Sequence, residues 1–111
     1  AAAWDAAKSR DAWEKLAGKR VWLKVAIKGT TNQYPLEDVK EAEYQAFEVG
    51  GIEGSDSGLP MRCFVKKGTR HERLLKQAKG YGPGKPEEFH VVKGVAKPNR
   101  QMLVEAIEKA D

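Results

Sequence analysis

One stretch of the sequence decides the fold class: Arg20-Val21-Trp22-Leu23-Lys24-Val25-Ala26-Ile27-Lys28. Its apolar members share one parity: Val21, Leu23, Val25 and Ile27. An alternation of period two over nine residues is typical of a β-strand with one buried and one solvated face. Gly29 ends the pattern, and the polar segment 30–38 that follows has the composition of a loop. The sequence therefore predicts a half-buried strand at 20–28.

Working outward, similar patterns predict four more strands and two helices. The strands are expected at 42–49, 60–67, 87–95 and 101–108, and the helices at 4–17 and 69–79. The last stretch carries apolar residues on both parities and also suits a helix. Thr69 and Glu72 have the spacing of a capping box at the start of the second helix.

The second strand contains a change of parity. Ala42, Tyr44 and Ala46 share one parity, and Phe47 and Val49 take the other. A slip of one residue within a strand indicates a β-bulge, which bends and twists the strand. The sequence therefore predicts a bulge between Ala46 and Phe47.

The order of elements is strand, strand, strand, helix, strand, strand, which is the order of an OB-fold. Four segments carry the resemblance: Gly18-Lys19-Arg20-Val21, Arg62-Cys63-Phe64-Val65, the helix at 69–79, and Phe89-His90-Val91-Val92-Lys93-Gly94-Val95. They resemble small bacterial OB-fold domains of the tRNA-anticodon-binding-like group. The resemblance implies a mainly β chain: a five-stranded Greek-key barrel with a helix between strands 3 and 4 and an extra N-terminal helix. Another small mixed α/β domain is the alternative.

Size and composition fit one soluble globular domain. The chain has 111 residues, of which 41% are hydrophobic and 32% charged. We expect an N-terminal helix at 1–18 and the barrel at 19–111, together forming a single domain. No apolar run approaches the length of a membrane-spanning helix, and the single cysteine, Cys63, excludes an internal disulfide. The initial Ala1-Ala2-Ala3 fits the mature end of an exported protein, but trimming explains it equally well, so a periplasmic and a cytoplasmic location are both open.

The charge is distributed unevenly. The net charge is +4, with a local excess of basic residues in 60–100 and of acidic residues in 37–56. A basic segment attracts polyanions through counterion release, whereas an acidic segment repels them. The oligomeric state does not follow from this pattern, although two opposite patches could also join copies head to tail.

A candidate ligand-binding surface follows from cations that alternate with aromatics. Strand 20–28 carries Arg20, Trp22 and Lys24 on its outward parity, and strand 60–67 carries Arg62, Phe64 and Lys66. An aromatic side chain between two cations suits a stacked base with flanking phosphates. In OB-folds the usual binding surface lies on strands 2 and 3 and the loops after strands 1 and 4. The candidate residues are Arg62, Phe64, Lys66, Trp22, Lys24, Lys97 and Arg100.

A different interpretation applies to the two aromatics. Trp22 and Phe64 could instead cover a second small core, since large aromatic side chains are mostly buried. The acidic residues of the loop after the first strand, such as Glu37 and Asp38, also oppose a phosphate backbone there. Two functions remain open: a binding module for single-stranded nucleic acid or another extended ligand on the strand 2–3 face, or an exported structural or protein-interaction module that binds no nucleic acid.

The sequence favours neither catalysis nor a cofactor. Cys63, His71 and His90 lie on three different elements without the paired spacing of a metal site, and the strand pattern places the thiol inside. No hydrolase or phosphate-binding motif occurs. We therefore expect no enzyme, no metal and no cofactor. The basic face of the second helix is interpreted as solvated surface: Arg70, Arg73, Lys76 and Lys79.

Overall fold

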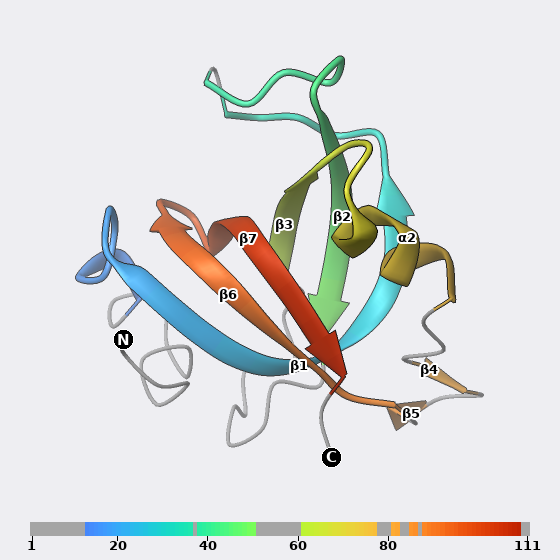
Figure 1. The fold of residues 1–111 in the computed structure, drawn as a ribbon. Coiled ribbons are helices and arrows are strands. Elements are labelled where there is room, and N and C mark those ends of the chain that lie inside the picture. Colours follow the sequence, from blue (N-terminus) through green and yellow to red (C-terminus); the bar gives the residue numbers. More distant parts are fainter. Residues whose placement is uncertain are drawn as a thin grey trace.

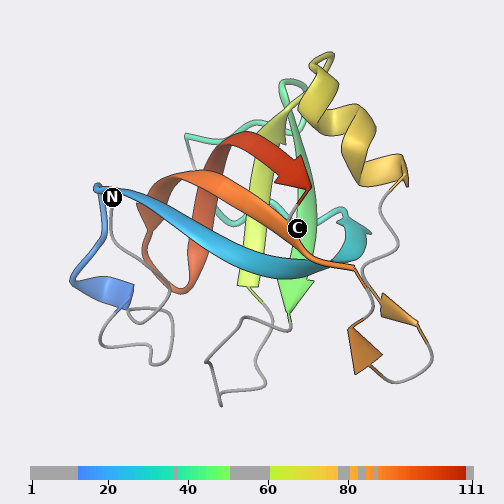
Figure 2. The same cartoon turned by 60° about the horizontal axis from the view of Figure 1, so that its bottom comes forward.

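The computed structural model of the chain describes residues 13–36, 38–50, 61–77, 81–82, 85–86 and 88–109. In chain order its elements are β1 (Arg20–Thr31), β2 (Tyr44–Gly50), β3 (Met61–Lys66), α2 (Arg70–Gln77), β4 (Tyr81–Gly82), β5 (Lys85–Pro86), β6 (His90–Lys97) and β7 (Gln101–Lys109). Figures 1 and 2 show the five longer strands curling around one axis, and α2 packs beside β1, β3 and β7.

The five longer strands form a closed barrel in the order β1-β2-β3-β7-β6, and β6 pairs with β1 to complete the ring. All neighbours are antiparallel except β3 and β7, which pair in parallel through Arg62–Val65 and Gln101–Val104. The prediction of a mainly β chain with a five-stranded barrel is confirmed. The stretch 101–109 is a strand rather than a helix, because its main chain pairs with β3 on one edge and β6 on the other.

β1 belongs to both halves of the barrel. Its first half pairs with β6 and its second half pairs with β2. The alternation of the sequence is realised, since its four apolar residues on one parity are buried in the barrel core. Lys28 is an extra residue between the pairs Ile27–Val49 and Gly29–Glu48, and Gly29 has a φ of 149°. This bulge bends β1 from one partner to the other.

The predicted bulge in the second strand is wrong. β2 pairs with β3 in unbroken register from Tyr44–Lys66 to Val49–Met61. Ala46 and Phe47 are both buried because the strand is covered on both faces. Phe47 belongs to the barrel core, and Ala46 lies under a second, smaller cluster outside the barrel. The change of parity in the sequence therefore arises because the two faces of β2 pack into two different cores, not because the strand contains a bulge.

The predicted N-terminal helix at 4–17 lies mostly outside the described residues. The described part is a helical turn in which the Leu16 N–H donates to the Trp13 carbonyl at 2.9 Å. Gly18, with a φ of 86°, follows this turn, as expected for a stop signal. Trp13 is fully buried in the barrel core, and Leu16 packs against that core. The segment before β1 is thus part of the barrel's packing.

α2 follows β3 and begins one residue later than the predicted 69–79, and residues 78 and 79 of that prediction lie outside the described residues. Its Leu75 is buried in the barrel core and Leu74 packs against it. The two-residue strands β4 and β5 then form a small hairpin before β6. The sequence did not predict this hairpin, because two residues are too few to show a period.

Candidate functional site

The outer face of β2 and β3 is covered by the chain's own connection between β1 and β2, drawn in teal in Figure 1. Phe64 has no exposed surface, and its ring centroid lies 5.9 Å from that of Tyr34. The Tyr34 hydroxyl donates to the Tyr44 carbonyl and accepts from the Ala46 N–H, each at 3.0 Å. These two bonds to the β2 main chain hold Tyr34 over Phe64. The second-core interpretation therefore describes Phe64, which has no face open to a stacked base.

Arg62 and Lys97 hold the same connection in place. The Arg62 guanidinium donates to Gln33 Oε1 and lies 3.7 Å from Glu48 Oε1. The Lys97 ammonium lies 3.2 Å from Asp38 Oδ2. This hydrogen bond from Lys97 lowers the pKa of Asp38. Both cations thus serve contacts within the chain.

The remaining candidate residues lie apart from one another. Arg100 is 4% exposed, in a turn where its φ is 55°. Trp22 and Lys24 are half-buried on β1, where they pair with β6 rather than β2, and the Lys24 ammonium lies 5.6 Å from the Phe89 ring centroid. Lys66 is exposed at the end of β3, beside α2. The barrel therefore does not bring the seven predicted residues into one surface.

A different group of cations surrounds α2, and we call it the α2 cationic surface. Its members are all exposed: Lys66, Lys67, Arg70, Arg73 and Lys76. None of the five has a carboxylate within 4 Å in the described part of the chain, whereas Arg20, Arg62, Lys93, Lys97 and Lys109 each have one. Glu72, the acidic residue of the helix, lies in the first turn of α2, where its carboxylate accepts a main-chain hydrogen bond.

The Glu72 side chain takes part in the N-terminal cap of α2. Glu72 Oε1 accepts the Gly68 N–H at 2.9 Å, and the Thr69 hydroxyl accepts the Glu72 N–H at 3.4 Å while donating to the Lys66 carbonyl at 2.8 Å. The predicted pairing of Thr69 with Glu72 is present, with the carboxylate on the amide one residue earlier than in a standard capping box. The carboxylate that could neutralise the surface is thereby committed to the backbone.

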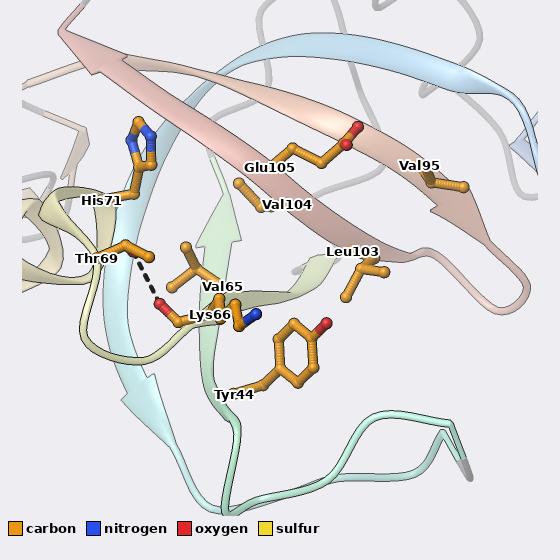
Figure 3. A pocket seen from close by; sticks show the side chains of 9 residues that line it. All are labelled: Tyr44, Val65, Lys66, Thr69, His71, Val95, Leu103, Val104 and Glu105. Carbon is orange, nitrogen blue, oxygen red and sulfur yellow. Dashed lines mark hydrogen bonds between the residues drawn. The ribbon is translucent and has the colours of Figure 1, made fainter.

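Two hollows flank the first half of α2. One, of about 290 Å³, opens where β3 and β7 separate and is shown in Figure 3. Its floor is apolar and its rim polar: Val65, Val95, Leu103 and Val104 below, and Tyr44, Lys66, Thr69, His71 and Glu105 around it. The other, of about 400 Å³, lies between α2 and β7 and is lined by Arg70, Arg73, Leu74 and Gln77 of α2 and by Ile107 and Glu108 of β7.

The acidic side chains at these hollows are neutralised by partners on the barrel. Glu105 Oε2 lies 3.1 Å from Arg20 Nη2, and Glu108 Oε2 lies 3.2 Å from Lys93 Nζ. Both carboxylates are thus paired with cations of β1 and β6, and neither forms an ion pair with a cation of α2 among the described residues. The local field near α2 is therefore positive.

The nucleophilic and titratable groups occupy separate, structural positions. Cys63 is fully buried, and burial raises the pKa of its thiol. His71 Nδ1 accepts the Ile107 N–H at 3.1 Å, which ties α2 to β7. His90 is 3% exposed, and burial lowers its pKa. Among residues whose placement is described, no three His, Cys, Asp or Glu side chains cluster as metal ligands would.

The geometry defines a small closed β barrel with a covered outer face and an exposed cationic surface around its helix, whose cations have no carboxylate partner among the residues that the structure describes. Neither a protein-family model nor a curated protein matches the chain. In the described ranges, no helix has the length and apolarity needed to cross a membrane.

The interpretation of the basic helix face as solvated is confirmed for Arg70, Arg73 and Lys76, which are exposed, and Lys79 lies outside the described residues. Sequence reasoning did not identify these residues as part of a candidate binding surface. A usable signal was present. The acidic residue of the helix sits at capping spacing from Thr69, where its carboxylate is directed to the first amides of the helix rather than to an ion pair with the basic residues.

Proposed function

We propose that the chain is a non-enzymatic OB-fold binding module. The strand order and the parallel pairing of the third barrel strand with the last support this assignment, as does a helix that follows the third strand. Packed side chains from both ends of the chain fill the barrel, so a ligand must bind outside it. The resemblance to tRNA-anticodon-binding-like domains belongs to this proposal.

The ligand we propose is single-stranded nucleic acid, bound along the α2 cationic surface rather than on the β2–β3 face. The observation that carries the proposal is the lack of carboxylate partners for the five cations near α2, within the described residues. Solvated, unpaired Lys and Arg side chains are the groups that exchange counterions for phosphates. Arg70, Arg73 and Lys76 recur every three residues, so they form a row along the helix.

The hollows beside this row favour a single strand over a duplex. A single strand presents both phosphates and unstacked bases, and its binding sites combine a basic track with apolar or aromatic platforms. Apolar floors lie on both sides of the row, formed by Leu103 and Val104 on one side and by Leu74 and Ile107 on the other. A duplex keeps its bases stacked and would leave both floors uncovered.

The test is a titration of a fluorescein-labelled oligo-dT with the protein at about 50 mM and about 200 mM salt. We expect binding that weakens steeply with salt. The double variant Arg70→Gln/Arg73→Gln should lower the slope of log K against log salt by roughly 0.7 for each lost phosphate contact. The matched control, Lys15→Gln/Lys19→Gln, removes the same charge from exposed positions before β1 and should retain the wild-type slope. Equal losses in both double variants would show that only net charge matters.

A protein-interaction module without nucleic-acid binding is the second candidate. The observation that favours it is the covering of the β2–β3 face by Tyr34, since that face is the usual nucleic-acid surface of OB-folds. Lack of oligo-dT binding at low salt would remove the first proposal and leave this one.

A further inference from the structure

The hollow between β3 and β7 lies at one end of the α2 cationic surface and shares Lys66 with it. Its walls come from five elements, β2, β3, α2, β6 and β7, and the turn before α2, and Figure 3 shows Tyr44, Lys66 and Leu103 on one side and His71 and Glu105 on the other. The hollow exists because β3 ends at Lys66 while β7 continues to Lys109, so the parallel pair separates beyond Val65 and Val104.

We propose that this hollow holds one unstacked base of the bound strand, an inference that rests on the proposed function. Its volume, about 290 Å³, is at the low end of the range for small-molecule pockets and suits one ring system. The floor of valine and leucine side chains offers an apolar surface for a flat ring, and the half-buried Tyr44 supplies an aromatic wall. Stacking on such surfaces tolerates any base, because every base has a π-face.

The polar rim distinguishes a base from a phosphate. Glu105 places a carboxylate on the rim, which disfavours a phosphate inside the hollow even though Arg20 pairs with it. His71 Nδ1 lies 3.1 Å from the Ile107 N and 3.3 Å from the Ile107 carbonyl oxygen, so this nitrogen faces the β7 main chain and the rest of the imidazole edge lines the hollow. A base edge has both donors and acceptors and can pair with a carboxylate and with an imidazole nitrogen.

Lys66 fixes how the strand enters. Lys66 belongs to both the hollow and the α2 cationic surface. A phosphate next to the bound base can therefore meet Lys66, while the following phosphates reach Lys67, Arg70 and Arg73. The base and the backbone then bind to adjacent parts of one surface, and each can be removed separately by substitution.

The experiment compares oligo-dT with an oligonucleotide of the same length that has abasic sites throughout. Wild-type protein should bind oligo-dT roughly 5- to 100-fold more tightly, as expected for one base stacked on an aromatic side chain. Tyr44→Leu should reduce this ratio to near one while leaving the salt dependence unchanged. Val95→Phe, which fills the hollow from β6, should do the same. The control variant Trp22→Leu removes a half-buried aromatic outside the hollow and should keep the wild-type ratio.

The outcomes separate the two proposals. If wild-type protein binds both oligonucleotides equally, the base pocket is wrong and binding along α2 stands. If it binds neither at low salt, both proposals fail. Photocrosslinking of wild-type protein to a 5-iodouracil oligonucleotide gives a readout that needs no variant: we expect adducts at Tyr44 or His71, and adducts confined to Trp22 would overturn the pocket.

Discussion

The indole Nε1–H of Trp13 donates a hydrogen bond to the main-chain carbonyl oxygen of Lys97 at 2.8 Å. The bond joins the segment before β1 to the end of β6, beside the bonds from Gly18 N–H to the Ala96 carbonyl and from Ala96 N–H to the Lys19 carbonyl. The indole itself is fully buried in the barrel core. Trp13 therefore acts as a plug at this end of the barrel.

We expect Trp13→Phe to lower the free energy of unfolding by about 1–3 kcal/mol, because it removes the donor and leaves the Lys97 carbonyl without this partner. Trp13→Ala should cost more, about 3–5 kcal/mol, because it also empties a large core volume. Urea denaturation followed by circular dichroism measures both. A Trp13→Phe variant as stable as wild type would contradict the role of the hydrogen bond.

The buried His90 should make stability depend on pH. Burial lowers its pKa in the folded protein, and the nearby Lys109 lowers it further while Glu88 raises it. The unfolded chain therefore takes up a proton first as the pH falls below about 6.5, and the free energy of unfolding declines toward the folded pKa. Above about pH 6.5 His90 is neutral in both the folded and the unfolded chain, and its contribution to the free energy of unfolding is fully present.

The measurement is the urea midpoint between pH 7.5 and 5 for wild type and His90→Gln. The variant should lose much of the decline in the upper part of this range, where carboxylates do not yet titrate. Parallel curves for the two proteins would show that His90 does not cause the decline.

Gly94 marks the closest approach of β6 to β7. A Cβ added there would overlap the Leu103 carbonyl oxygen and lie 2.8 Å from the Val104 Cα, and these are backbone atoms that cannot rotate away. Gly94→Ala should cost about 1–3 kcal/mol or prevent folding, because the two strands would have to separate. Thermal unfolding measures the loss, and a variant that melts with wild type would contradict this contact. The control Val91→Ala, on the same strand, should cost less.

Glu43 should weaken binding of a polyanion to the α2 cationic surface. Its carbonyl accepts the Lys67 N–H at 2.9 Å, so its exposed carboxylate belongs to the neighbourhood of that surface. We expect Glu43→Gln to tighten oligo-dT binding by roughly two- to fivefold at low salt, with the gain lost at high salt through screening. Glu48→Gln removes the same charge at the other end of β2, beside Arg62, and should have a smaller effect. A larger effect of Glu48→Gln would place the ligand elsewhere.

Cys63 should not react with a thiol reagent such as Ellman's reagent in the folded protein. The thiol is fully buried and its pKa is raised, so the reactive thiolate is scarce and inaccessible. In urea above the unfolding transition it should react fully. Rapid reaction under native conditions would show that the β3 region opens readily.

The barrel was predictable because strand periodicity reports burial directly. Val21, Leu23, Val25 and Ile27 repeat with period two, and all four lie in the core. That reasoning assumes one buried face per strand, and it failed where β2 and β3 are covered on both. The parity of strand 60–67 places Phe64 on the outward face, but the structure buries Phe64 under Tyr34. Tyr34 lies thirty residues earlier, in a loop whose sequence has no periodic pattern.

The candidate site was less predictable because charge neutralisation is a property of three-dimensional neighbours. Arg62 and Arg70 look alike in the sequence, yet Arg62 meets Glu48 across the β2–β3 pair, while Arg70 extends from the helix without such a partner among the described residues. Only the strand register determines which cations remain available. The register of β1 with β2 also shifts at Lys28, and no periodic pattern in the sequence predicts that bulge.

The parallel seam between β3 and β7 also sets the order of events during synthesis. β7 comes last among the barrel strands and supplies partners to both β3 and β6. A nascent chain on the ribosome can assemble β1, β2 and β3, but the ring cannot close before residues 101–109 leave the exit tunnel. Until then β3 presents an unsatisfied strand edge, the feature through which incomplete chains aggregate. Translational pausing just before Gln101 should therefore increase the demand of this protein for chaperones.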